Sequence, residues 1–155
     1  MCPKSWMKLC LIALFILLLS CTPQSEHNGD DSPTKLAVES YEPVDFGTFN
    51  DTILTAITDG QVWPQDPIEI VRNFINSPGA RSVNILREDD RGEGADSTTV
   101  IIVEEGYEDD SLRGTWHRFR LARSPDGTWR ILDVRRAYRC WRGQHQNSYS
   151  RELCP

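Results

Sequence analysis

The sequence predicts an α+β fold, with two N-terminal helices packed on a four-stranded antiparallel meander and the C-terminal residues forming a loop. Two observations support this class. Apolar residues with helical spacing come first in the globular part, and apolar runs of strand length follow between turn-rich segments. Short joints favour antiparallel pairing of consecutive strands. Because the chain has 155 residues, we expect one domain, at residues 36–155.

Two short helices are expected before the strands. Asn50 or Asp51 can cap the first helix. Asp66 can cap the second, with Pro67 at its first position, and residues 77–79 (Ser-Pro-Gly) should stop it. The second helix presents one apolar stripe, which comprises Ile68, Val71 and Ile75.

The clearest turn lies between the last two strands, at residues 124–127 (Ser-Pro-Asp-Gly). A three-residue loop there places Leu121 opposite Ile131 and His117 opposite Arg135. The four strands are expected at residues 81–88, 98–105, 113–123 and 128–139.

This register leaves several apolar residues on the face away from the helices. Either a β-bulge shifts the register after Ile131, or arginine side chains and another segment cover that face. The sequence leaves both alternatives open. The residues concerned are Trp116, Leu132, Val134 and Tyr138.

The N-terminus has the features of a secretory signal. Lys4 and Lys8 precede an eleven-residue apolar run at 9–19, which is shorter than the roughly 20 residues that span a bilayer. The run ends in Leu18-Leu19-Ser20-Cys21, which resembles the lipobox of bacterial lipoproteins. The resemblance implies a signal peptide at 1–20, acylation of Cys21, and a membrane anchor made of several acyl chains.

Residues 21–35 are expected to form the lipidated N-terminus and a disordered tether, because they lack apolar periodicity. Thr22 follows the cysteine. Enterobacterial lipoproteins retained in the inner membrane usually carry aspartate there, so the resemblance implies an outer-membrane protein facing the periplasm. An ordinary signal peptide or an uncleaved anchor is the alternative.

In that compartment the two remaining cysteines should pair. Cys140 and Cys154 bracket the C-terminal segment, and an oxidising environment favours a disulfide between them. The predicted fold therefore ends in a disulfide-closed loop.

The net charge of −6 conceals a strong asymmetry. Residues 22–112 hold 20 acidic and 5 basic residues, whereas residues 113–155 hold 3 acidic and 10 basic residues. Neutralisation across the sheet is one explanation, and an anionic envelope ligand is the other. A lipid anchor argues against nucleic acid as the partner of the arginine-aromatic strands.

The candidate ligand-binding residues are His117, Asp133, Arg118 and Arg120. His117 could act with Asp133, which the predicted register places diagonally across the hairpin, although a structural histidine is the alternative. We assign no catalytic residue, metal site or cofactor. The acidic residues at 88–96 lack the EF-hand spacing, and those at 104–110 are expected around an exposed turn.

The order of two helices and then four strands resembles the cystatin-like and NTF2-like folds. Three functions follow as hypotheses: a lipid-anchored, non-enzymatic module that binds an envelope protein or anionic envelope ligand; a small NTF2-like hydrolase or isomerase with a pocket between helices and sheet; and a structural envelope spacer. A pocket lined by both His117 and Asp133 would favour the enzyme, and an exposed arginine patch would favour the binding module.

Overall fold

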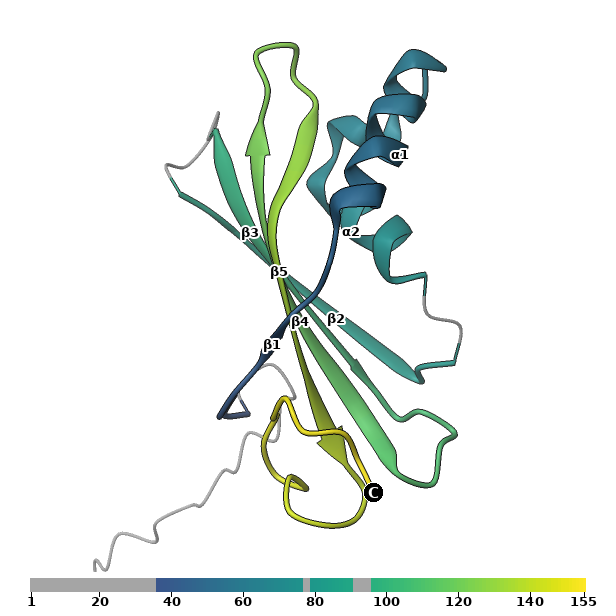
Figure 1. Ribbon diagram of the computed structural model, residues 1–155, viewed down its shortest axis with the longest axis vertical. Coiled ribbons are helices and arrows are strands. Elements are labelled where there is room, and N and C mark those ends of the chain that lie inside the picture. The colour runs from purple at the N-terminus through teal and green to yellow at the C-terminus, as the bar shows by residue number, and fades with distance from the viewer. Residues whose placement is uncertain (1–35, 77–78, 91–95) are drawn as a thin grey trace, which may run out of the picture. The chain divides into compact units, whose positions relative to one another are not determined.

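The computed structural model describes residues 36–76, 79–90 and 96–155. Five antiparallel strands form one sheet in the order β1-β5-β4-β3-β2, and two α-helices pack on it (Figure 1). The predicted α+β class is confirmed, whereas Cys21, the signal peptide and the tether lie outside the described residues. The elements are β1 (Glu42–Pro43), α1 (Gly47–Thr58), the 3-10 turn η2 (Trp63–Gln65), α2 (Pro67–Ile75), β2 (Ser82–Asp89), β3 (Ser97–Glu105), β4 (Leu112–Arg123) and β5 (Trp129–Cys140).

Helix α2 begins where the sequence predicts. The Asp66 carboxylate accepts a hydrogen bond from the Ile68 N–H at 2.8 Å, and Pro67 occupies the first turn, where its missing N–H costs nothing. The helix ends before residues 77–79, because Asn76 adopts a left-handed conformation with φ of 36°.

Helix α1 begins earlier than predicted, at Gly47, and neither Asn50 nor Asp51 caps it. Asn50 instead faces the sheet. Its side-chain amide donates to the Ile131 carbonyl at 2.9 Å, and its side-chain oxygen accepts from the Ile131 N–H at 3.0 Å. Asn50, which the sequence suggested as a helix cap, therefore attaches α1 to β5.

The β4–β5 hairpin has the predicted turn and, further along, a bulge. The Ser124 N–H donates to the Thr128 carbonyl at 2.7 Å, and Leu121 faces Ile131 as expected. Leu132 is then an extra residue, so the next pair is Arg120 with Asp133. From Arg120 to Gly114 every partner moves by one position, and a second irregularity at Leu112 reverses the shift. His117 consequently faces Arg136, and the predicted pairing with Arg135 is wrong.

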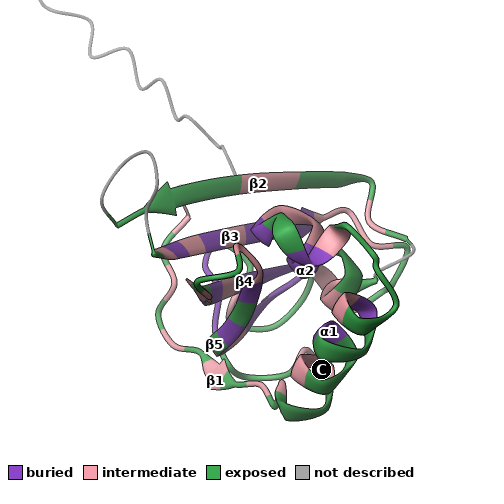
Figure 2. Cartoon of the chain, turned by 90° about the horizontal axis from the view of Figure 1, so that it is seen from above, coloured by how far each residue is buried: buried purple, intermediate pink, exposed green. Residues whose placement is uncertain are grey.

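Strand β1 was not predicted. It consists of only two residues, Glu42 and Pro43, which pair with Arg136 and Arg135 at the edge of β5. At the other edge, β2 is exposed along most of its length, whereas β3, β4 and β5 carry the buried residues (Figure 2).

Each face of the sheet has its own hydrophobic core. On the face that packs against the helices, here called the helix face, Phe119 and Leu121 contact Ile53 of α1 and Val71 of α2 within one buried cluster. On the opposite, outer face, Tyr149 from the C-terminal segment completes a second cluster. That cluster contains Val103, Trp116, Ala137 and Tyr149, with Leu36 and Val38 packed against it.

The two covering layers lie toward opposite ends of the sheet. The helices lie near the β4–β5 turn, whereas the C-terminal segment lies at the far end of the same strands (Figure 1). Arg118 on the outer face is partly exposed, and the helix face is hollowed beyond the C-terminal end of α2. Both alternatives for the outer face thus apply, because the bulge returns Val134 to the helix face while another segment covers Trp116.

The predicted disulfide is present between Cys140 and Cys154, whose Cα atoms are 5.4 Å apart. The segment that it closes is hydrogen-bonded both to the start of the domain, at Ala37, and to β5, at Tyr138. The Tyr149 N–H donates to the Ala37 carbonyl at 2.9 Å, and Ser150 and Tyr138 exchange two backbone hydrogen bonds. The C-terminal loop is therefore part of the core.

Candidate functional site

The four predicted site residues divide between the two faces. Successive residues of a strand point to opposite faces, so His117 lies on the helix face while Arg118 and Arg120 lie on the outer face. Asp133 faces Arg120 in the register, and its carboxylate lies 3.6 Å from the Arg118 guanidinium. His117 and Asp133 are therefore on opposite sides of the sheet and do not form the pair that was considered for an enzyme.

The outer face carries an unusual juxtaposition of like charges. Arg118 and Arg135 are direct cross-strand partners, an arrangement that is destabilising without a counter-charge. Asp133 supplies it, because its carboxylate lies 3.0 Å from the Arg135 Nε and 3.6 Å from an Arg118 Nη. One carboxylate thus serves two guanidinium groups.

Tyr41 holds both of these guanidinium groups beside the sheet. The guanidinium carbons of Arg118 and Arg135 lie 5.6 and 5.5 Å from the centre of its ring, within the range of cation–π attraction. Tyr41 itself stacks on Trp116 at 6.3 Å between ring centres, and it remains 43% exposed. Neither Tyr41 nor Arg135 was predicted from the sequence as a site residue.

Arg120 completes what we call the arginine face: Arg118, Arg120, Arg135, Asp133 and Tyr41. Arg120 is exposed and makes no ion pair with any described residue, and the buried Nε of Arg118 has no hydrogen-bond partner among them. Three guanidinium groups share one carboxylate, which leaves two positive charges uncompensated. Guanidinium groups bind phosphate and carboxylate in bidentate geometry, so the charge and chemistry of this surface suit an anionic ligand.

His117 lies on the helix face with little access to solvent. It is 9% exposed, and its buried Nδ1 makes no hydrogen bond to a described residue. Burial, and secondly the nearby positive charge of Arg136, lowers the pKa of His117 from 6.5 to about 4. The imidazole is therefore neutral near pH 7.

Arg136 forms an ion pair with the Glu42 carboxylate of the edge strand β1. Its guanidinium donates to the Glu42 carboxylate at 2.7 and 3.1 Å, and the Tyr138 hydroxyl donates to the same oxygen at 2.9 Å. The Arg136 and Tyr138 hydrogen bonds hold the pKa of Glu42 below its ordinary value. Burial, and then the bond to Glu42, raises the pKa of Tyr138 to about 12.

The acidic residues at 104–110 are less uniform than expected. Glu105 forms an ion pair with Arg139 at 3.2 Å, which is the predicted neutralisation across the sheet. Glu104, expected near an exposed turn, is 3% exposed, because residue 104 alternates onto the helix face. Within the described ranges no three His, Cys, Asp or Glu side chains lie close enough to hold a metal ion.

Comparison of the chain with protein-family models, curated proteins and solved structures found no match. In the part of the chain that the structure describes, no helix is long and apolar enough to cross a membrane. The arginine face is therefore the candidate site on its geometry and charge alone.

Proposed function

We propose that this protein is a lipid-anchored component of the bacterial envelope, acylated at Cys21, that binds a phosphate-bearing anionic envelope surface through its arginine face. It acts as a binding module and not as an enzyme. The lipobox-like leader supports the anchor, and the partly exposed arginine face, with its excess of positive charge, supports the binding activity.

One observation carries the binding activity, namely the direct pairing of Arg118 with Arg135 beside a single carboxylate. Asp133 offsets only part of the repulsion between these two guanidinium groups. A phosphate oxyanion between them would relieve that repulsion and would also reach Arg120, which has no partner among the described residues. Apolar residues lie in the same row, because Ile101 faces Arg118 and Leu86 faces Ile101. A charged surface with apolar neighbours suits an anionic lipid headgroup layer.

The anchor and the surface are tested separately. Mass spectrometry of the mature N-terminal peptide should show an acylated Cys21, and a peptide beginning elsewhere or carrying a free thiol would refute the anchor. For the surface, the chain is produced without the leader and with Cys21→Ser, so that no lipid contributes to binding. Sedimentation with phosphatidylglycerol-rich vesicles should then retain the protein, and phosphatidylcholine vesicles should not.

Replacing Arg118, Arg120 and Arg135 with glutamine should abolish that retention, because it removes the positive charges that attract the anionic lipid headgroups. Retention should also fall with increasing salt. The matched control replaces Arg72, Arg81 and Arg151 with glutamine. These arginines are exposed elsewhere on the protein, so this triple variant should bind the vesicles as strongly as the unaltered protein does. Equal loss in both triple variants would show that net charge, and not the arginine face, causes retention.

A further inference from the structure

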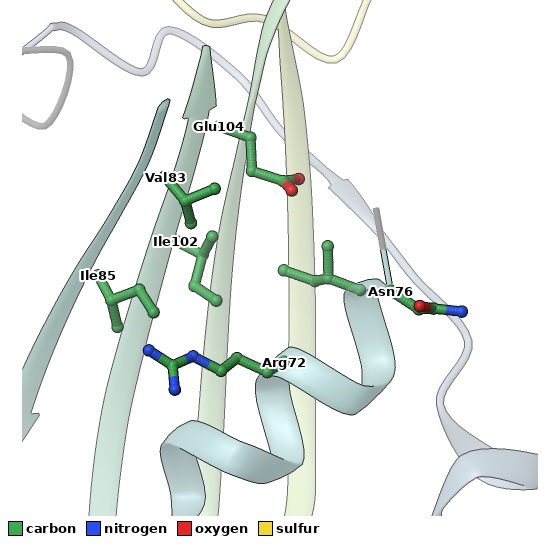
Figure 3. Close-up of a pocket in the computed structure, with 7 residues that line it drawn as sticks. Arg72, Asn76, Val83, Ile85, Ile102 and Glu104 are labelled. Carbon is green, nitrogen blue, oxygen red and sulfur yellow. The ribbon is translucent and has the colours of Figure 1, made fainter. Parts of the chain in front are cut away.

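A second candidate site lies on the helix face, beyond the C-terminal end of α2. Two cavities adjoin there and share Ile75, with volumes of about 280 and 380 Å³. The smaller cavity is lined by Arg72, Ile75, Asn76, Val83, Ile85, Ile102 and Glu104. In Figure 3 the apolar side chains of Val83, Ile85 and Ile102 lie between Glu104 and Arg72. This cavity is close to the lower end of the range for small-molecule sites, about 300 Å³.

Glu104 is the charged group at one end of this apolar wall. Its Oε2 accepts hydrogen bonds from the Tyr107 hydroxyl at 2.8 Å and the Thr115 hydroxyl at 3.1 Å. These neutral donors orient the carboxylate, but they do not balance its charge. Glu104 is 3% exposed and forms no ion pair with any described residue. A buried charge without a counter-ion is costly, so a bound cation would stabilise this arrangement.

The basic side chains near Glu104 already have acidic partners. The Arg72 guanidinium lies 2.7 Å from Glu69, and the Arg136 guanidinium lies 2.7 Å from Glu42. His117, on the neighbouring strand, is neutral near pH 7 and has a fully buried Nδ1 without a hydrogen-bond partner. The unbalanced charge of the two cavities is therefore the single negative charge of Glu104.

We propose that the smaller cavity binds a small aliphatic amine, with the ammonium group on the Glu104 carboxylate and the carbon chain along Ile75, Ile85 and Ile102. An ammonium group supplies both the missing positive charge and hydrogen-bond donors. The aliphatic wall favours a ligand with a carbon chain, because contact between the two removes apolar surface of both from water. Neither the arginine face nor its proposed ligand is required for this site.

The test uses the full-length chain in non-ionic detergent and pentylammonium as the probe. Isothermal titration calorimetry should show saturable binding of pentylammonium, with much weaker binding of pentan-1-ol or pentanoate. In the same titration the ¹³C resonance of the Glu104 carboxyl carbon should move. Glu104→Gln keeps the shape and removes the charge, and it should weaken binding by about tenfold or more. Glu88→Gln changes an exposed glutamate on the outer face and should leave the affinity unaltered.

Circular dichroism and thermal unfolding establish whether each variant is folded. If Glu104→Gln does not fold, the comparison of pentylammonium with pentan-1-ol on the unaltered protein still decides the question. Equal affinities for the amine and the alcohol would overturn the proposal, as would the absence of saturable amine binding. An unchanged affinity in a folded Glu104→Gln protein would also overturn it.

Discussion

The buried imidazole of His117 leads to a specific dependence of stability on pH. Its pKa is about 4 in the folded protein and 6.5 when the chain is unfolded, because burial and Arg136 disfavour the imidazolium. Between these values the unfolded chain binds a proton that the folded protein does not. The free energy of unfolding therefore falls as the pH falls through this window, and the contribution of neutral His117 is complete above pH 6.5.

The size of the effect follows from the difference between the two pKa values. A shift from 6.5 to about 4 corresponds to about 3 kcal/mol of unfolding free energy, lost progressively between those pH values. His117→Leu removes the titrating group while leaving an apolar side chain next to Phe119 and Ile102. The difference between the two proteins, as a function of pH, isolates the contribution of His117 from those of the carboxylates.

The assay is urea unfolding followed by tryptophan fluorescence, at a series of pH values from 7 down to 4. We expect the stability of the unaltered protein to fall more steeply than that of His117→Leu as the pH is lowered, by about 3 kcal/mol over the whole window. Parallel curves for the unaltered protein and His117→Leu would refute the burial of His117.

Three further predictions concern stability and are checked by the same urea unfolding. Tyr149→Ala should lower the free energy of unfolding by about 3 to 5 kcal/mol, because Tyr149 is completely buried in the outer core. Trp141→Ala in the same segment should lower it by about 1 kcal/mol or less, because Trp141 is partly exposed. Similar losses in the two variants would show that the segment is not part of the core. Asn50→Ala should cost about 1 to 3 kcal/mol by leaving both backbone groups of Ile131 without their partners, and the exposed Asp51→Ala should change stability by about 0.5 kcal/mol or less. Reducing the Cys140–Cys154 disulfide, which closes a separation of 14 residues, should cost about 3 kcal/mol, and an unchanged midpoint with reductant would contradict this estimate.

Local signals predicted the elements well where one short segment determines the structure. Asp66 and Pro67 determine the start of α2 through one hydrogen bond and one fixed backbone angle. The Pro125-Asp126-Gly127 loop determines the first pairs of the hairpin, including Leu121 with Ile131. These features depend on residues close together in the chain, so the sequence was sufficient.

The features that decide the site depend on residues far apart in the chain. The bulge at Leu132 adds one residue, and because side chains alternate, one residue exchanges the faces of all that follow. That exchange separates His117 from Asp133 and places Asp133 between two arginines. Strand β1 has no periodicity to detect, because it consists of two residues selected by Arg136 and Arg135 more than ninety positions later.

The contact between the two ends of the domain determines how it would respond to mechanical load. Residues 37 and 39 are hydrogen-bonded to Tyr149, and Val38 forms a parallel bridge with it. A pull applied through an N-terminal anchor would act on this parallel pairing in shear, and from there it would pass into a segment cross-linked to β5 by the disulfide. Part of the load would therefore be carried by the disulfide-closed segment and β5, and only the remainder would continue along residues 40–46 into α1.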